Sequence, residues 1–98
     1  MTLRIDPEQN EVRALEQVTD WRGKRVLEIG CGDGRLTRRL AELGAKVLAI
    51  DPDAERVRAA RKALPQKFAK LVQFKPGSAE RLAHPDASFD AVILAWSL

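Results

Sequence analysis

The feature that most constrains the fold is a glycine loop set between a strand pattern and a helix pattern. Residues 25–29 form a short, mostly apolar segment, which is typical of a buried strand. Residues 30–34 read Gly-Cys-Gly-Asp-Gly, and a helix is predicted from Arg35 to about Leu43, where Gly44 ends it. Because glycine lacks a Cβ atom, such a loop can turn sharply and bring its backbone close to a ligand.

The same order recurs in the next stretch of the chain. Residues 46–50 are apolar enough for a second buried strand, which ends at Asp51. Asp53 can cap a helix that runs to about Leu64, because its carboxylate can accept from the free backbone N–H groups of the first turn.

Two further strands complete the pattern. A weaker one is predicted over 71–74 and a fourth over 89–94, separated by a turn at 76–78, a short helix over 79–82 and a loop over 84–88. Strands that alternate with helices predict a parallel sheet with right-handed crossovers. The expected fold class is therefore α/β.

The first 24 residues are predicted to be a helix and a lead-in. Asp6 supplies an N-cap, Pro7 takes the first helical position, and Gln9 follows three residues after the cap. The apolar residues on one face of this helix are Val12, Leu15 and Val18.

The composition indicates an ordinary globular domain. Hydrophobic residues make up 45% of the chain and charged residues 32%. No apolar run approaches the roughly 20 residues that cross a bilayer, and the first ten residues do not resemble a secretory signal. The single cysteine, Cys31, can form neither an internal disulfide nor a zinc site alone, so the cytoplasm is the expected compartment.

The net charge of +3 is small, but basic residues recur in the second half of the chain. Clustered lysine and arginine can bind phosphates, whereas a solvated helix face is the commoner explanation of such a run. No aromatic residue stands between Glu55 and Lys67 to stack on bases, which disfavours nucleic acid. The basic residues are Arg56, Arg58, Arg61, Lys62, Lys67 and Lys70.

Three polar features are expected to meet at the carboxyl ends of the strands, where parallel sheets bind ligands. The first is the glycine loop. The second is Asp51, which lies 21 residues beyond Gly30, where an acid can accept from both hydroxyls of a ribose. The third is the polar turn 77–80, which could meet an adenine edge.

Each feature also has a purely structural explanation. The loop can be only a turn, Asp51 can be an acid at the start of the helix after Pro52, and Ser78 can cap the segment that follows it. Their occurrence together at these spacings favours an adenosine-containing ligand.

A dinucleotide is the competing ligand. Its usual fingerprint is G-x-G-x-x-G, in which a helix N-terminus holds the pyrophosphate. Here the glycines are spaced G-x-G-x-G, and the acids Glu28 and Asp33 would repel a pyrophosphate. A ligand with an amino group and a sulfonium tolerates those acids.

At these residues the sequence resembles the class I S-adenosylmethionine-dependent methyltransferases, in particular the small-molecule group that includes ubiquinone-biosynthesis enzymes. Residues 26–34 resemble the first motif, 48–53 the acidic second motif, and 77–82 and 88–93 the third region and fourth strand. The resemblance covers 26–98 and implies a Rossmann-like parallel sheet with helices on both faces. It also implies S-adenosylmethionine as methyl donor and S-adenosylhomocysteine as product.

The resemblance implies roles for single residues around the methionyl part of the ligand. Glu28 would hold the amino group, and the loop backbone would contact the rest of that part. Cys31 falls on a family-typical loop position, which disfavours a nucleophile; no catalytic residue and no metal ligand is assigned. Besides Glu28, the residues expected here are Gly30, Cys31 and Gly32, with Ala95 or Trp96 near the methionyl end.

On the adenosine side, the resemblance implies that Asp51 binds the ribose hydroxyls and that Pro52 packs on the adenine. Ser78 and Ala79 would meet the adenine edge. The family usually has Asp at the position of Ser78, and a neutral serine accepts a weaker hydrogen bond than a carboxylate does.

Residues 1–98 are therefore expected to be one S-adenosylmethionine-binding domain, with 25–98 as the cofactor-binding half and the fold truncated after the fourth of seven strands. The expected function is methyl transfer to a small-molecule acceptor, with neither nucleic acid nor a membrane as partner. The missing half normally supplies much of the acceptor pocket, so little transfer is expected from this chain alone. The alternative is a non-catalytic module that binds the cofactor or packs against a partner, and the third candidate is an NAD-binding oxidoreductase fragment.

The fourth predicted strand is expected to have an open edge, because the family's fifth strand is not in the chain. Residues 91–96 are apolar and contain no proline or lysine that would protect such an edge. Unpaired backbone groups favour pairing with another copy, which predicts a two-fold homodimer through antiparallel copies of this strand.

Overall fold

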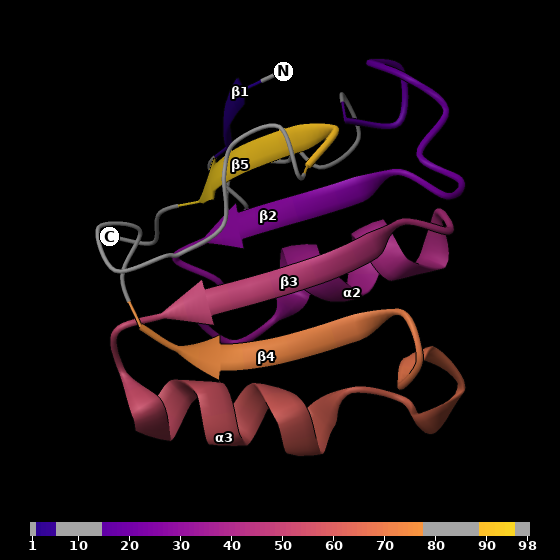
Figure 1. Ribbon diagram of the computed structural model, residues 1–98. Coiled ribbons are helices and arrows are strands. Elements are labelled where there is room, and N and C mark those ends of the chain that lie inside the picture. Colours follow the sequence, from indigo (N-terminus) through magenta and orange to yellow (C-terminus); the bar gives the residue numbers. More distant parts are fainter. Residues whose placement is uncertain (1, 6–14, 78–88, 96–98) are drawn as a thin grey trace.

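A five-stranded parallel sheet with the strand order β1-β5-β2-β3-β4 organises the chain (Figure 1). The computed structural model describes residues 2–5, 15–77 and 89–95. The strands are Thr2–Ile5 (β1), Arg25–Ile29 (β2), Lys46–Asp51 (β3), Val72–Pro76 (β4) and Ala91–Ala95 (β5). The helices are Arg35–Glu42 (α2) and Ala54–Ala63 (α3), followed by the short 3₁₀ helix Gln66–Phe68 (η2).

The α/β fold class is confirmed, and the central strands and helices lie close to their predicted positions. β2 spans the predicted residues, and β3 extends through Asp51. Asp53 caps α3 as expected, since its Oδ1 accepts from the backbone N–H groups of Glu55 and Arg56 at 3.0 and 3.3 Å. The outer strand β4 and the strand β5 each begin one or two residues later than predicted.

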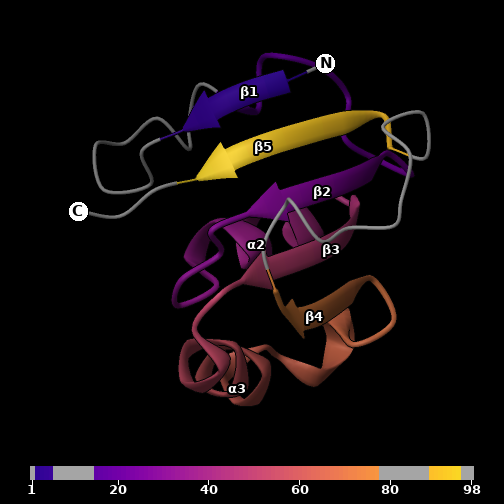
Figure 2. The same ribbon diagram turned by 60° about the vertical axis from the view of Figure 1, so that its left-hand side comes forward.

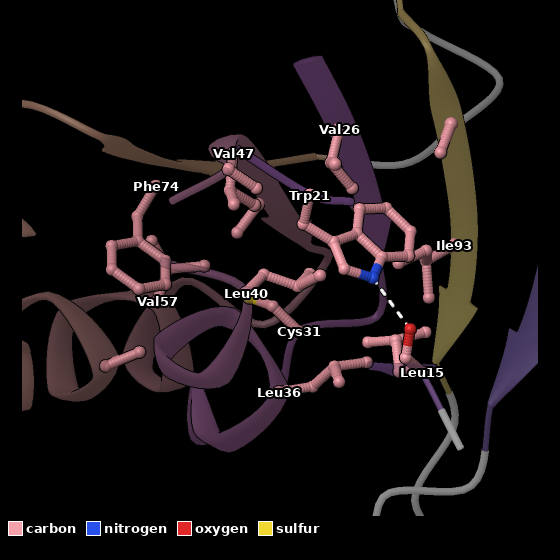
Figure 3. Close-up of a cluster of buried hydrophobic side chains, with 14 residues drawn as sticks. Leu15, Trp21, Val26, Cys31, Leu36, Leu40, Val47, Val57, Phe74 and Ile93 are labelled. Carbon is pink, nitrogen blue, oxygen red and sulfur yellow. Dashed lines mark hydrogen bonds between the residues drawn. The ribbon is translucent and has the colours of Figure 1, made fainter. Parts of the chain in front are cut away.

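Both described helices cover the same face of the sheet. Figure 3 shows Leu36 and Leu40 of α2 and Val57 of α3 packed against side chains of the strands. Trp21 lies in the same cluster, and its Nε1–H donates to the carbonyl of Leu15 at 2.7 Å. The opposite face has a smaller buried cluster, and the short helix expected over 79–82 lies outside the described residues. That smaller cluster is formed by Leu27, Leu48 and Ile50, with Ile29, Phe89 and Val92 packed against it.

The expectation of an open edge at residues 91–96 is wrong for the part of the strand that the structure describes. β1 pairs in parallel with β5 over four residues, from Thr2 beside Val92 to Ile5 beside Ala95 (Figure 2). The N-terminal segment thus satisfies backbone N–H and C=O groups that would otherwise lack partners. Because this edge is occupied, the argument for a homodimer through β5 no longer applies, and the oligomeric state stays a question for sedimentation.

The predicted N-terminal helix lies mostly outside the described residues. Leu15 is helical and fully buried, as its place on the predicted apolar face requires. Val18, predicted on the same face, lies in a turn and is 44% exposed, so that prediction is wrong at this residue. The division of the chain at residue 24 stays a prediction.

Gly34 is the residue where the loop joins α2, and its replacement should destabilise the fold. Its φ is 82°, and a Cβ atom there would lie 3.2 Å from the Cβ of Ala60 and 3.5 Å from Cζ of Phe74. We expect Gly34→Ala to lower the free energy of unfolding by roughly 1–3 kcal/mol, from left-handed backbone strain and overpacking together. Urea unfolding measures the loss.

The matched control is Gly23→Ala. Gly23 has a similar φ of 72°, but a Cβ atom there meets no described atom within 4 Å. This variant should therefore show the backbone strain alone. Equal losses in the two variants would contradict a packing role for Gly34.

Candidate functional site

The glycine loop crosses the carboxyl end of the neighbouring strand β3. The backbone N–H groups of Gly30 and Cys31 both donate to the carbonyl of Ile50, at 2.8 and 3.0 Å. The N–H of Gly34 then donates to the carbonyl of Cys31 at 2.9 Å and closes a tight turn before α2. The loop backbone is therefore held at the edge of the sheet where parallel strands end.

Asp51 ties this loop to the end of β3. Its Oδ2 accepts from the N–H of Gly32 at 3.0 Å, and its Oδ1 accepts from the N–H of Asp53 at 2.9 Å. The side chain is nearly buried, at 6% exposure. Each carboxylate oxygen has a second lone pair, so Asp51 can still accept from hydroxyl groups of a ligand. The structure brings the loop and Asp51 together, as reasoning from adjacent strand ends predicted.

Gly32 is a buried residue of the loop that has room beside it for a further group. Its φ is 53°, and a Cβ atom built there would meet no described atom within 4 Å. A side chain at this position would project into space that a ligand lying against the loop could use.

Glu28 is a fully buried carboxyl group two residues before the loop. Its Oε1 accepts from the hydroxyl of Thr37 on α2, whereas its Oε2 has no hydrogen-bond partner among the described residues. The pKa of Glu28 is raised to about 8, chiefly by burial and also by the negative charges of Asp33 and Asp51, against the opposing Thr37 hydrogen bond. An acid at the edge of the site is thus mostly protonated at pH 7.

Thr37 was not among the predicted site residues. In the sequence it stands beside Leu36 and three residues before Leu40, two positions predicted to face inward. That spacing was the available signal, because a hydroxyl on the inner face of a helix needs a buried acceptor.

Cys31 has the properties of a buried structural thiol. Its side chain lies in the core cluster (Figure 3) and is 5% exposed. Burial raises its pKa to about 12, and the neighbouring acids Glu28 and Asp51 act in the same direction. A thiol that stays protonated at neutral pH is a poor nucleophile, which supports the expectation that Cys31 contributes only its backbone.

Two of the remaining predicted site residues lie at the same edge of the sheet. Pro52 is exposed directly after β3. Ala95 ends β5 at the level of the loop, since Leu94 pairs with Ile29 of β2. The other three lie outside the described residues: Ser78, Ala79 and Trp96.

The basic residues of α3 form an exposed face, and acidic residues at the start of the same helix partly neutralise its charge. Nε of Arg56 lies 3.7 Å from Oδ2 of Asp53, and Nη1 of Arg58 lies 3.4 Å from Oε1 of Glu55. Arg61 instead donates to the carbonyl of Phe74 at 2.8 Å. This pattern is typical of a solvated helix face.

Neither a metal site nor a membrane-spanning helix is found within residues 2–5, 15–77 and 89–95. No three His, Cys, Asp or Glu side chains in these ranges gather closely enough to hold a metal ion. No helix in this part of the chain is long and apolar enough to span a bilayer.

Comparison with known proteins covers the same loop and strands. A family model described as a methyltransferase domain matches residues 26–98. An uncharacterized methyltransferase of Mycobacterium tuberculosis is 42% identical over 83 residues, which are 81% of this chain and 32% of that protein. The mitochondrial ubiquinone biosynthesis O-methyltransferase of Mus musculus is 40% identical over 74 residues, 72% of this chain and 20% of that protein. The chain thus spans about a third or less of the length of these relatives.

Solved structures with the same fold include two bacterial proteins. The YcgJ protein of Bacillus subtilis superposes with a TM-score of 0.75 at 28% identity, over 86% of this chain and 36% of that one. An S-adenosylmethionine dependent methyltransferase of Mesorhizobium loti gives a TM-score of 0.74 at 27% identity, over 92% of this chain and 39% of that one. The similarity in fold therefore extends over most of this chain.

Proposed function

We propose, because the chain belongs to the methyltransferase domain family, that it carries the S-adenosylmethionine site of an enzyme that methylates a small molecule. The observation that carries this proposal is the contact between the glycine loop and Asp51. The N–H of Gly32 donates to Asp51 Oδ2 at 3.0 Å, so the loop backbone and the carboxylate proposed to accept from a ribose lie at one edge of the sheet.

Two features of the structure fit this ligand. The space beside Gly32 would take a group that lies against the loop. Oε2 of Glu28, which has no hydrogen-bond partner among the described residues, and the acids Asp33 and Asp51 suit a cation. S-adenosylmethionine carries an ammonium and a sulfonium group, whereas the pyrophosphate of NAD would be repelled by the negative charges of Asp33 and Asp51.

Different residues would bind different parts of the ligand, as the family resemblance implies. Glu28 and the loop would hold the methionyl part, with Ala95 near its end. Asp51 would hold the ribose, and Pro52, Ser78 and Ala79 would contact the adenine. The ligand, when bound, supplies a methyl group made electrophilic by its sulfonium. The chain itself contributes binding and orientation, which in favourable systems lower a barrier by roughly 7–11 kcal/mol.

The proposed acceptor class rests on the relatives. The mouse relative is named as an O-methyltransferase of ubiquinone biosynthesis, and a small-molecule acceptor is proposed for this chain on that ground. This chain spans a fifth of that protein. Cofactor binding by the chain is therefore tested by itself, and methyl transfer is measured in a separate assay.

Calorimetry of the 98-residue chain tests the proposal. Titration with S-adenosylmethionine and with S-adenosylhomocysteine should each give saturable binding, and NAD should give none. Binding of NAD without S-adenosylmethionine would instead favour the oxidoreductase fragment. Absence of heat with all three ligands, confirmed by unchanged thermal unfolding, would reject an adenosine site.

Substitution of Gly32 locates the site on the loop. We expect Gly32→Ala to weaken S-adenosylmethionine binding about tenfold or more, equivalent to ~1.4 kcal/mol, because the new methyl group enters the space beside the loop. Gly23→Ala is the control, since Gly23 has a comparable φ of 72° and likewise no described neighbour within 4 Å. Both variants should lose similar stability, and only Gly32→Ala should lose affinity. Unchanged affinity in Gly32→Ala would place the ligand elsewhere.

A further inference from the structure

Thr37 and Glu28 form a fully buried polar pair between α2 and β2. The Thr37 hydroxyl occupies one oxygen of the carboxyl group, and the other, Oε2, has no partner in the part of the chain that the structure describes. The residues beside Glu28 on the flanking strands, Ala49 and Ile93, are apolar. A buried polar atom without a partner costs free energy, so its presence calls for an explanation.

We infer that Thr37 is a positioning residue for ligand binding: its hydrogen bond fixes Glu28 with Oε2 left for a cationic group of the ligand, and Glu28 gives up a proton when that cation binds. The inference rests on the proposed function, because the ammonium group of S-adenosylmethionine is the cation in question. The proton passes to the solvent buffer, and no covalent bond other than O–H changes. Thr37 acts through Glu28 and needs no contact with the ligand itself.

The charges around Glu28 support this coupling. Asp33 in the loop and Asp51 at the end of β3 are both acidic, and together with burial, the largest cause, they raise the pKa of Glu28 to about 8. The nearby thiol of Cys31 has its own pKa raised to about 12 and brings no charge at neutral pH. The Thr37 hydrogen bond acts in the opposite direction and favours the ionised form. An arriving cation would strengthen that effect and lower the pKa of Glu28 further.

The direction of the pH dependence follows from these charges. Without ligand, Glu28 is mostly protonated below pH 8, and the ligand binds the ionised form. Affinity should therefore increase with pH, by up to about tenfold per unit. The α-amino group of a ligand loses its own charge near a pKa of about 7.7–8.0. The measurement thus belongs between about pH 5.5 and 7.5, where the ammonium stays charged.

Two substitutions of Thr37 separate positioning from packing. Thr37→Val keeps the shape of the side chain and removes the hydroxyl, whereas Thr37→Ser keeps the hydroxyl. In the ligand-free chain, the Glu28 carboxyl followed by carbon-13 NMR should titrate near pH 8 in the parent. The midpoint should be about one to two pH units higher in Thr37→Val and unchanged in Thr37→Ser. A purely structural role for Thr37 would lower stability without moving this midpoint.

Calorimetry with S-adenosylmethionine, in two buffers of different ionisation enthalpy, counts the protons released. The parent should release close to one proton per ligand near pH 6.5, and Glu28→Gln should release none. Thr37→Val should bind roughly tenfold more weakly at pH 7, and Thr37→Ser should match the parent.

The two arms keep the possible failures apart. Parent binding without proton release, or a Glu28 midpoint that Thr37→Val does not move, would overturn the inference. Failure of the parent to bind S-adenosylmethionine would overturn the proposed function and the role of its cation. The carboxyl titration still decides whether Thr37 holds Glu28, because it needs no ligand. Thermal unfolding of each variant confirms that it is folded.

Discussion

We expect the Glu28→Gln variant of the ligand-free chain to be more stable than the parent at pH 8 and close to it near pH 4. Glu28 is fully buried, and its pKa is raised from 4.5 to about 8 in the folded chain. Glutamine resembles the neutral acid in shape and keeps an oxygen that can accept from Thr37, but it does not ionise. The gain at pH 8 should be up to roughly 5 kcal/mol, because each unit of pKa shift corresponds to about 1.4 kcal/mol.

The sign of this effect follows from proton binding. Between pH 4.5 and about 8, the unfolded chain has lost the Glu28 proton and the folded chain retains it. The stability that the neutral carboxyl contributes is therefore complete below pH 4.5 and is lost progressively as the pH rises through about 8. The acids with lowered pKa values, Asp20, Glu42 and Asp90, change stability only in the acid range. Glu28 should thus dominate the slope between pH 5 and 8.

Urea unfolding at several pH values tests the expectation. Glu42→Gln is the matched control, because Glu42 is an exposed glutamate whose pKa is lowered by hydrogen bonds from Arg39 and Arg38. Removal of the Glu42 charge should give no gain in the free energy of unfolding at pH 8. Stability curves of Glu28→Gln and the parent that run parallel from pH 4 to 8 would show that the carboxyl ionises equally in both states.

The same substitution should weaken ligand binding, which gives the buried acid a reason to be there. Within the described residues no cation pairs with Glu28, and a buried acid without a counter-charge destabilises the free chain. A cationic ligand would supply that charge. At functional sites it is common for a substitution to raise the stability of the protein and at the same time to weaken ligand binding. A Glu28→Gln variant with higher stability and unchanged affinity for S-adenosylmethionine would leave Glu28 without a part in the site.

The central strands and helices could be predicted because local signals and the final packing agree there. β2 and β3 are short apolar runs, and Asp53 begins α3 with a side chain suited to a cap. The glycine loop and Asp51 could also be placed together, because neighbouring parallel strands end at one edge of a sheet.

The strand β1 could not be predicted with the same methods. Thr2–Ile5 alternates polar and apolar residues over only four positions, too few to identify a strand from the sequence alone. It becomes a strand by pairing with β5, some 90 residues away in the chain, and such a contact leaves no local signal. For Thr37 the helical spacing indicates a buried hydroxyl, but its partner Glu28 is brought near only by the packing of α2 on the sheet.

Asp51→Ala should cause the largest loss of S-adenosylmethionine affinity among the substitutions at the sheet edge. It removes the proposed charged acceptor of the ribose hydroxyls and also the acceptor that holds the N–H of Gly32. Hydrogen bonds to a charged group contribute about 1.5–3 kcal/mol, which corresponds to a loss of roughly 10- to 150-fold in affinity. Calorimetry at pH 7 measures it directly.

Asp53→Ala is the control for effects that pass through α3. Asp53 lies two residues further on, is exposed, and caps the helix through the N–H groups of Glu55 and Arg56. Its loss should lower stability by about 0.5–2 kcal/mol and leave affinity near that of the parent. Equal losses of affinity in both variants would mean that Asp51 acts by placing α3.

A ligand that lacks one ribose hydroxyl distinguishes contact with the ribose from support of the loop. The parent should bind the 2′-deoxy analogue of S-adenosylhomocysteine more weakly than the full ligand, because the Asp51 carboxylate then loses one donor. Asp51→Ala should bind the two ligands about equally, since the group that senses the hydroxyl is gone. The coupling in this cycle measures the contact itself. If removal of the hydroxyl weakens binding equally in parent and variant, Asp51 supports the loop through Gly32 and another group binds the ribose.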